Sequence, residues 1–298
     1  MDNLITVFTP TFNRAYCLSK LYKSLCNQSN NNFIWLVIDD GSSDGTNELV
    51  TKWINEGNID IDYHYKANGG MHTGHNLAYK LIKTELNVCI DSDDHMPLNA
   101  IDLILNRWSG IKNKTNYAGL IGLDVFEDGS IVGDKFPAKV VEGDFIDIYK
   151  KHNLRGDKKI VLKTEILKKY PLYPEFKGEK LVPLGVLYLL IGKDYLFKYT
   201  NDVYCVVEYQ NDGSSKTIFK QYMQSPKGFA YARKIHIRNS TNFFDKMKSY
   251  IHLISSSVFA NDLSISFKRV NPIFTILLLP FGILLCFFIY SKNKLFTD

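Results

Sequence analysis

Two acidic segments constrain the fold of this chain more than any other feature. Residues 36–46 read LVIDDGSSDGT, and residues 89–94 read CIDSDD. In both, acidic residues directly follow an apolar run of the kind that forms a buried strand. Ligands of open α/β sheets bind beyond the carboxyl ends of parallel strands, where such acids would gather. We therefore predict one ligand held at two points of one sheet edge, with a divalent cation at the second segment. This pattern fits a nucleoside diphosphate-sugar.

Alternating strand and helix patterns predict the rest of the fold. Helices are expected over about 15–27, from an N-cap at Asp44, and in a short stretch ending at Leu81. Strands are expected at 4–8, 33–38, 59–65 and 87–90. Such alternation indicates an α/β fold with a doubly wound, mainly parallel sheet. Neither GxGxxG after the first strand nor GxxxxGK[ST] occurs, which removes the main support for NAD binding and ATP hydrolysis.

Length and composition fit one α/β domain with an appendage. The chain has 298 residues, of which 45% are hydrophobic and 22% charged. Its five cysteines are scattered without ligand-like spacing, which favours a reduced, cytosolic setting over disulfides or a zinc site. No secretory signal is expected before the first strand. We predict a catalytic domain at 1–215, a basic helical extension at 216–263 and a membrane-associated segment at 264–298.

The charge distribution supports that division. Residues 216–298 contain 12 Lys/Arg and 3 Asp/Glu, a net of +9, whereas the first 215 residues carry a net of −4. A basic tail alone would suit nucleic acid, but this tail includes the apolar run NPIFTILLLPFGILLCFFIY at 271–290. That run approaches the length of a membrane span, and basic residues flank it on both sides. We predict membrane association and no nucleic-acid partner; a buried core helix is the alternative.

The path of the apolar run is open at this point. Pro280 and Gly282 lie in its middle, so a kinked or re-entrant segment competes with a straight span. A simple span would also place Lys292 and Lys294 on the outer side, against the positive-inside tendency. A re-entrant or interfacial segment that turns near Pro280 is therefore favoured.

The DSDD segment has the chemistry of a metal site. Alternate residues at the mouth of a strand aim Asp91 and Asp93 toward the same space. Hard carboxylate oxygens suit Mg²⁺ or Mn²⁺, which complete their coordination with water and substrate phosphates. A helix cap is the other interpretation, because Pro97 and an apolar-periodic stretch follow.

Four ordered motifs carry a family resemblance. PTFNR at 10–14, VIDDGSSDGT at 37–46, NGG at 68–70 with HN at 75–76, and DSDD at 91–94 together resemble the inverting family 2 glycosyltransferases with the GT-A fold. The bacterial O-antigen and capsular polysaccharide enzymes are the nearest type. The resemblance covers about residues 3–125 strongly and 126–215 more weakly.

The resemblance implies a set of site residues. Asp40, or else Asp39, would contact the uracil or ribose, and Asp93 with Asp91 would hold the metal that bridges the diphosphate. One departure is that Met71 and His75 stand where the family usually has Lys and Arg. His72 and His75 would replace those cations in part, or would simply pack or cap the helix. The complete implied nucleotide-sugar site comprises Thr9, Pro10, Asn13, Arg14, Asp39, Asp40, Asn68, Gly69, His75, Asn76, Asp91 and Ser92.

A general base is expected in the later part of the chain. Inverting transfer is an in-line displacement, in which a carboxylate removes the proton of the attacking acceptor hydroxyl. The segment YPEFKGEKLVPLG at 173–185 resembles the family's late acidic motif, and we predict Glu179 as the base, with Glu175 as the second choice. The stretch 207–215 resembles the strand and turn that close the domain, and no QxxRW motif follows it. Single-sugar transfer is therefore favoured over processive polymerisation.

Together these features predict a Mn²⁺- or Mg²⁺-dependent enzyme at the cytoplasmic face of the inner membrane. It would move one hexose or N-acetylhexosamine from a UDP-sugar to a sugar acceptor linked to undecaprenyl diphosphate. Membrane lipids would be its other partner; the donor sugar, linkage and oligomeric state stay open. One alternative is a nucleotidylyltransferase, which would normally show a glycine-rich, basic first loop in place of TPTFNR. Another is a non-catalytic membrane protein that binds sugar nucleotides.

Overall fold

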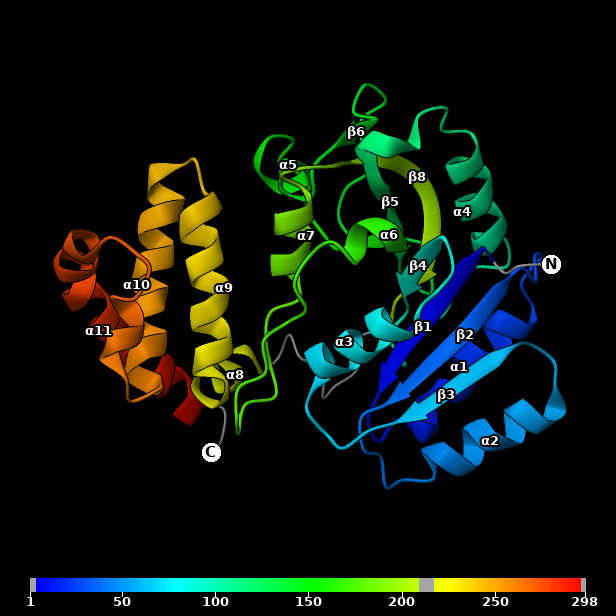
Figure 1. The fold of residues 1–298 in the computed structure, drawn as a ribbon, viewed down its shortest axis with the longest axis horizontal. Helices are drawn as coiled ribbons and strands as arrows, with labels where there is room; N and C mark the ends of the chain where they lie inside the picture. Colours follow the sequence, from blue (N-terminus) through cyan, green and yellow to red (C-terminus); the bar gives the residue numbers. More distant parts are fainter. Residues whose placement is uncertain (1–3, 209–216, 296–298) are drawn as a thin grey trace. The chain divides into compact units, whose positions relative to one another are not determined.

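The computed structural model describes residues 4–208 and 217–295, so most of the predicted closing segment at 207–215 lies outside the described residues. The chain divides into two compact units. The first comprises Met1–Leu172 and Leu187–Gln210, and the second comprises Tyr173–Val186 and Asn211–Asp298. All the described strands lie in the first unit, and the second is helical (Figure 1).

Through β4 (Leu86–Cys89) the elements follow one another in the alternating order that the sequence predicted. Up to the middle of the sheet they are β1 (Ile5–Thr11), α1 (Ala15–Cys26), β2 (Phe33–Asp39), α2 (Thr46–Glu56), β3 (Ile61–Tyr65), α3 (Met71–Leu81), β4 (Leu86–Cys89), α4 (Ala100–Ser109), η1 (Lys114–Asn116) and β5 (Tyr117–Val125). The later elements are β6 (Glu142–Gly143), α5 (Phe145–Lys150), β7 (Lys158–Lys163), α6 (Thr164–Leu167), α7 (Gly185–Ile191), β8 (Leu196–Val206), α8 (Ile218–Gln224), α9 (Pro226–Asn239), α10 (Phe243–Phe259), η3 (Leu263–Ser266) and α11 (Pro272–Leu295).

The sheet has eight strands in the order β3-β2-β1-β4-β7-β5-β8-β6. Strands β3, β2, β1 and β4 run parallel, so their carboxyl ends share one edge. Strand β7 runs antiparallel to β4 and β5, whereas β8 pairs parallel with β5. The register pairs Thr11 with Asp39, which brings the turn after β1 beside the first acidic segment.

Helices cover both faces of the sheet, as predicted for a doubly wound fold. Successive strand residues point to opposite faces, so Trp35 of β2 packs under α1 and α2 while Phe8 of β1 faces α3. The Trp35 ring lies 6.1 Å from the Tyr22 ring and 5.9 Å from the Trp53 ring. On the other face the Phe8 and Tyr79 rings lie 5.7 Å apart.

Helix α2 begins one residue later than predicted. Its N-cap is Gly45, in the left-handed region with φ 86°, rather than Asp44. The Asp44 carboxylate accepts hydrogen bonds from the N–H of Thr46 at 3.2 Å and from the N–H of Ala15 at 2.9 Å. Asp44 therefore joins the starts of α1 and α2. The sequence pattern missed this role because Ala15 lies 29 residues away.

The second unit packs α9 and α10 around a small core of buried side chains, to which α11 adds Phe274 and Leu278. Helix α11 runs without a break through Pro280, so the predicted turn near Pro280 is wrong. Proline removes one backbone N–H, and contacts with α10 hold α11 on both sides of that position. Before Pro280, the Phe274 and Tyr250 rings lie 5.7 Å apart; after it, the Cys286 thiol lies 3.5 Å from the Ser255 carbonyl oxygen.

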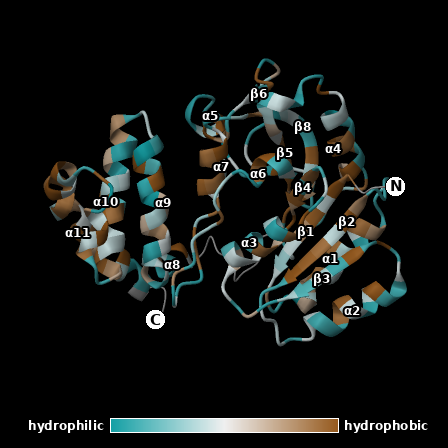
Figure 2. Cartoon of the chain, in the orientation of Figure 1, coloured by the Kyte–Doolittle hydropathy of each residue, from teal (hydrophilic) through white to brown (hydrophobic). Residues whose placement is uncertain are grey.

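Helix α11 has the length and composition of a membrane-crossing helix. Among the described residues, the 22 residues Pro272–Asn293 have a mean hydropathy of 2.6 and are 22% buried. Figure 2 shows α11 as a largely apolar helix. The expected helical C-terminal region with an apolar segment is thus confirmed.

Candidate functional site

Two turns are joined at the carboxyl edge of the parallel strands. The Asn13 N–H donates to the Ser42 hydroxyl at 2.9 Å, and the Asn13 side-chain oxygen accepts the N–H of Ser43 at 2.8 Å. Asn13 itself lies in the left-handed region, with φ 52°. Arg14 lies next to it, partly exposed, with its guanidinium 5.6 Å from the Tyr16 ring centroid. Asn13 therefore holds the turn after β1 against the loop after β2.

Asp39, the first acid after the apolar part of β2, stabilises the loop that follows this strand. Asp39 is fully buried, and its two oxygens accept hydrogen bonds from the N–H of Ser42 and the hydroxyl of Tyr63, each at 2.7 Å. Charged hydrogen bonds of this kind are stronger than neutral ones. They fix the loop at the end of β2 and leave Asp39 without exposed surface.

The second acid organises the glycine-rich turn. Asp40 is 4% exposed and accepts the N–H of Gly69 at 2.9 Å and of Gly70 at 2.7 Å. Its carboxylate also forms an ion pair with Lys66 at 2.5 Å, and Lys66 donates to the Thr73 hydroxyl at 2.7 Å. Asp40 and Lys66 together set the path of the chain into α3. Sequence reasoning missed Lys66.

Two polar atoms at this edge lack a hydrogen-bond partner among the described residues. They are the Thr11 hydroxyl, at the end of β1, and the Asn68 side-chain oxygen, in the turn after β3. Buried polar atoms are normally hydrogen-bonded, so such exceptions require an explanation. A bound ligand would supply the missing partners. Thr11, unlike Asn68, was not among the predicted site residues.

The neighbouring residues of β1 face other parts of the protein. The Thr9 hydroxyl is buried and accepts a hydrogen bond from the Trp35 indole at 3.0 Å. Pro10 packs against Gly74 of α3, where an added Cβ would lie 3.1 Å from the Pro10 Cβ. These two residues support the edge through packing.

The DSDD segment forms a turn after β4, not the extended chain expected, because the Asp94 N–H donates to the Asp91 carbonyl oxygen at 3.0 Å. Asp91 and Asp93 are partly exposed, whereas Ser92 and Asp94 are 7% exposed. The buried Asp94 accepts the N–H of Glu208 at 3.2 Å. Asp94 therefore anchors the segment, and Asp91 and Asp93 keep surface through which they could reach a ligand.

A buried lysine lies behind this segment. Lys159 of β7 forms an ion pair with Asp94 at 3.8 Å. Burial works to lower the pKa of Lys159, but the charges of Asp124, Cys205, Asp94 and Asp91 outweigh burial and raise it well above its usual value. Lys159 is therefore a fixed positive charge among buried acids.

Asp124 belongs to the same cluster. Burial raises its pKa, against the opposing effect of Lys159. One of its side-chain oxygens has no hydrogen-bond partner among the described residues. The predictions from sequence included neither Lys159 nor Asp124, because both lie far beyond the DSDD segment in the chain and outside its motif.

His75 does not supply a cation to the glycine-rich turn. His75 is 1% exposed, and its Nδ1 lies 2.9 Å from the Tyr79 hydroxyl. Burial lowers the pKa of His75 to about 4, so the ring is neutral at pH 7. His72 and Asn76 are also buried, at 1% and 3% exposure. Packing into the core, the alternative left open by the sequence, is what the structure shows for His75.

The predicted base is engaged in a helix cap within the second unit. The Glu179 carboxylate accepts the N–H of Lys227 at 3.0 Å and of Gly228 at 2.9 Å, at the start of α9. The first N–H groups of a helix need such acceptors, and its N-terminus favours negative charge. Glu175, the second choice, is exposed.

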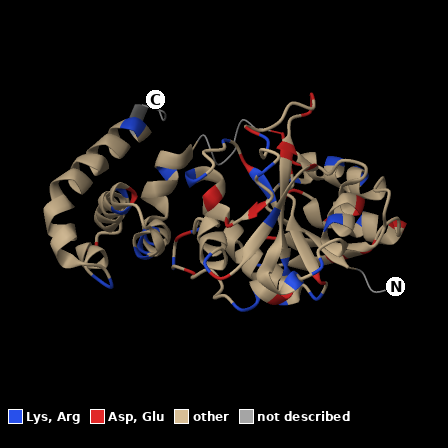
Figure 3. Cartoon of the chain, turned by 90° about the horizontal axis from the view of Figure 1, so that it is seen from above, with Lys and Arg blue, Asp and Glu red and all other residues tan. Residues whose placement is uncertain are grey.

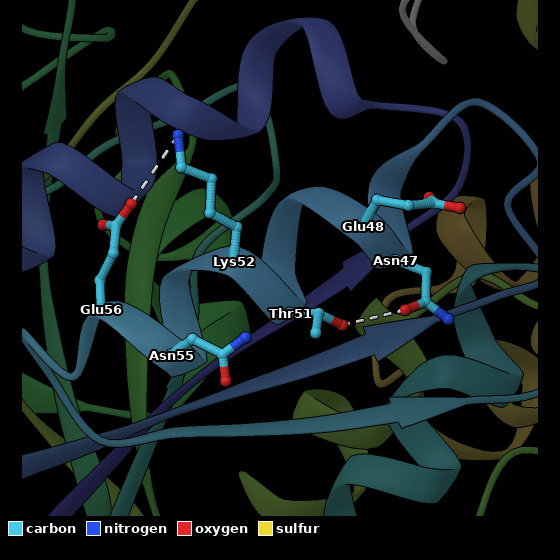
Figure 4. Close-up of a pocket in the computed structure, with 6 residues that line it drawn as sticks. All are labelled: Asn47, Glu48, Thr51, Lys52, Asn55 and Glu56. Atoms are coloured by element: carbon cyan, nitrogen blue, oxygen red, sulfur yellow. Dashed lines mark hydrogen bonds and ion pairs between the residues drawn. The ribbon is translucent and has the colours of Figure 1, made fainter.

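No described group of three or more His, Cys, Asp or Glu residues has a metal-binding arrangement. A hollow of about 600 Å³ lies along α2, lined by polar side chains such as Thr51 and Lys52 (Figure 4). It contains none of the predicted site residues. The five cysteines are all free, as expected.

Part of this chain is similar to known glycosyltransferases. Residues 6–119 match the family model described as glycosyl transferase family 2. A curated relative from Campylobacter jejuni, "GalNAc(5)-diNAcBac-PP-undecaprenol beta-1,3-glucosyltransferase", is 25% identical over 233 residues, which cover 74% of this chain and 71% of the relative. Other matches cover 21% of an uncharacterized glycosyltransferase from Rickettsia bellii and 35% of the glycosyltransferase GlyG from Streptococcus pneumoniae. The chain thus spans about a third or less of those two relatives.

Solved structures show the same fold. Staphylococcus aureus TarS 1-349 in complex with UDP-GlcNAc superposes with a TM-score of 0.58 at 18% identity, over 90% of this chain and 75% of that chain. The mannosyltransferase PcManGT from Pyrobaculum calidifontis, in complex with GDP-Man and Mn²⁺, gives 0.53 at 16% identity, over 99% and 84%. The predicted GT-A type α/β fold is confirmed. Residues 6–119 thus match a family 2 glycosyltransferase domain, and the curated relatives named above are glycosyltransferases.

Proposed function

We propose that this protein is an inverting glycosyltransferase that transfers a single hexose or N-acetylhexosamine from a UDP-sugar. Its acceptor would be a sugar on undecaprenyl diphosphate, at the cytoplasmic face of the inner membrane, in cell-surface polysaccharide assembly. The observation that carries the proposal is the sheet edge described above. There the side chains of Asp91 and Asp93 are partly exposed, and Thr11 and Asn68 each have a buried polar atom without a hydrogen-bond partner among the described residues.

This edge suits the donor. The Thr11 hydroxyl and the Asn68 amide offer hydrogen bonds to a nucleoside, and Asp40 and Lys66 hold the intervening turn in place. Asp91 and Asp93 fit a divalent cation that takes its remaining ligands from phosphate and water. Mn²⁺ or Mg²⁺ bound there would stabilise the charge of the departing UDP. Two proteins of similar fold are known in complex with UDP-GlcNAc and with GDP-Man and Mn²⁺, which agrees with this chemistry.

The acceptor is proposed from two independent features. The Campylobacter jejuni relative is named for a sugar chain on undecaprenol diphosphate, and it matches this chain over most of both lengths. Helix α11 is apolar enough to associate with the membrane in which such an acceptor is anchored. The acceptor hydroxyl would attack the anomeric carbon, the bond to the UDP oxygen would break, and a carboxylate of the 173–185 segment would take the hydroxyl proton.

The test is UDP release in the presence and absence of metal. Asp93→Asn keeps the side-chain shape and removes a charge, so turnover should fall by about two orders of magnitude or more while the melting temperature stays unchanged. Asp128→Asn, in an exposed turn of the same unit, is the matched control and should keep wild-type turnover. EDTA should abolish wild-type activity, and Mn²⁺ or Mg²⁺ should restore it.

Three outcomes would contradict the proposal. Full activity in EDTA would remove the metal role, and release of diphosphate instead of UDP would indicate a nucleotidylyltransferase. UDP-sugar binding without any turnover across a panel of UDP-sugars and lipid-linked acceptors would indicate a binding protein.

A further inference from the structure

Helix α11 has an inward face that is fixed to its own unit. Thr275, Gly282, Cys286 and Ile289 are buried and recur at the spacing of one helix face. An added Cβ at Gly282 would lie 2.4 Å from Ile254 of α10, so the two helices approach closely there. The inward face thus belongs to the core of the second unit.

The opposite face of α11 is apolar and exposed. Its large side chains are between 51% and 67% exposed: Ile276, Leu277, Phe281, Leu284, Phe287 and Phe288. The exposed surface continues onto the start of α10, because the Phe243 ring is 58% exposed and lies 6.3 Å from the Phe274 ring. Contiguous apolar surface of this extent is unusual on a soluble protein and indicates a partner or a membrane.

Four basic residues gather at the beginning of α11. Lys234 and Arg238 come from α9, and Lys268 and Arg269 come from the loop before α11. Arg238 donates to the Arg269 carbonyl oxygen at 3.4 Å, which brings the two segments together. Burial lowers the pKa of Lys234, and the charges of Arg238, Lys268 and Arg269 lower it further. Such a cluster beside an apolar face complements anionic headgroups above an acyl layer.

Packing against α10 disfavours a simple upright span for α11. Figure 3 shows α9 and α10 nearly end-on while α11 runs across them. Contacts with α10 extend along α11 from Phe274, beside Tyr250, to Cys286, beside Ser255. If α11 crossed a bilayer, α10 would enter with it, and its polar residues around His252 and Ser255 are costly to place in hydrocarbon. A helix in the plane of the interface avoids this cost.

We propose that the second unit docks on an anionic bilayer, with α11 lying in the plane of the interface. Its exposed apolar face enters the outer acyl layer, and Lys234, Arg238, Lys268 and Arg269 contact lipid phosphates. This extends the membrane association in the proposed function, and it does not depend on the transfer chemistry. A membrane contact fixed in this way would hold the enzyme beside lipid-linked substrates without requiring α11 to cross the bilayer.

The orientation of α11 can be measured by depth-dependent quenching in the full-length protein. Leu277→Trp, Leu284→Trp and Phe288→Trp place single reporters along the exposed face. The native Trp35, Trp53 and Trp108 are at most 5% exposed, in the core of the first unit, where they form a constant background. Phosphatidylcholine–phosphatidylglycerol vesicles with bromines at defined acyl depths serve as the probe.

An in-plane helix places the three reporters at the same shallow depth. An upright helix would separate the first and last of these reporters by roughly 16 Å in depth, at about 1.5 Å per residue, and that result would overturn the proposal. Absence of quenching in all three variants would also overturn it. A soluble dimer that covers the apolar face and ignores vesicles would show instead that the partner is a second copy of the chain.

The basic cluster is tested by vesicle flotation. Lys268→Gln with Arg269→Gln should weaken binding to anionic vesicles about 25-fold, since each base near the surface contributes about five-fold. Lys23→Gln with Lys52→Gln, on exposed positions of α1 and α2, is the control of equal charge change and should bind as wild type. Equal binding by both double variants would remove the cluster from the interface. UDP release toward a water-soluble acceptor reports the catalytic proposal separately.

Discussion

Lys159 lies in an environment that its position in the sequence does not indicate. It is a buried cation whose ion-pair partner, Asp94, lies beyond the end of another strand and anchors the DSDD segment. Asp124, on a third strand, adds another buried acid. Lys159 and the two acids stabilise one another, because a buried charge of either sign without its partner would destabilise the folded protein.

Removing that cation should be costly. Lys159→Met leaves Asp94 and Asp124 without their positive neighbour, and we expect a loss of about 3–5 kcal/mol in the free energy of unfolding. Lys52→Met, at a 72% exposed side chain in a weak 3.9 Å pair, should change it by less than about 0.5 kcal/mol. Urea denaturation measures both. Adding Asp124→Asn to Lys159→Met should recover part of the loss; equal stability of the two lysine variants would contradict the role of Lys159.

His75 gives the fold a defined acid sensitivity. Its pKa is about 4 in the folded protein, against an ordinary value of 6.5. The unfolded chain therefore binds more protons between these values, so stability falls as the pH drops from about 6.5 toward 4. The full effect is about 3 kcal/mol below pH 4. His75→Asn removes this titration, so its melting temperature should decline less than that of the wild type between pH 7 and pH 4.5. Parallel declines would show that His75 is not the titrating group.

At the scale of elements, acidic side chains hold loops and helix starts in place. Asp44 joins the first residues of α1 and α2, Asp40 holds the turn before α3, and Glu179 caps α9. Each satisfies backbone N–H groups that a turn or helix start leaves without partners. Several acids that belong to the family-like motifs therefore accept hydrogen bonds from backbone N–H groups of this chain and stabilise its turns and helix starts.

Substitution of Glu179 separates its role as a helix cap, which affects stability, from its proposed role as the general base, which affects turnover. Glu179→Gln weakens two charge-assisted hydrogen bonds at the start of α9, so we expect about 1–2 kcal/mol less stability. As the proposed base it should also reduce turnover strongly while UDP affinity stays unchanged. Glu175→Gln, at an exposed neighbour, should leave stability unchanged. Normal turnover of Glu179→Gln well below its melting temperature would limit Glu179 to the cap and make Glu175 the base to test.

At the scale of the whole molecule, the proposed function assigns donor binding to the first unit and membrane association to the second. The first has the mixed sheet, whose parallel part presents the acidic edge, and the matched family domain at residues 6–119. The second has a small helical core and an apolar, basic surface. The unit boundaries fall at Leu172, Val186 and Gln210, because residues 173–186 pack with the later helices. No local pattern in the sequence indicates that residues 173–186 belong to the second unit.

The sequence alone determined the order of strands and helices through β4, the sheet edge at which the acids meet, and the family resemblance. Apolar runs of strand length, helical periodicity and turn residues are local, so physical rules read them without knowledge of the rest of the chain. The same rules did not give the turn at Asp91–Asp94, where the Asp94 N–H donates to the Asp91 carbonyl oxygen at 3.0 Å.

Only the tertiary structure decided what the polar side chains contact. Lys159 meets Asp94 of a distant strand end, Glu179 meets Gly228 across 49 residues, and Arg238 meets Arg269 across 31. The unbroken course of α11 past Pro280 likewise depends on its packing against α10. Burial and charge at a residue are set by whichever segments the fold brings beside it, and those segments leave no signal in the residue's own neighbourhood.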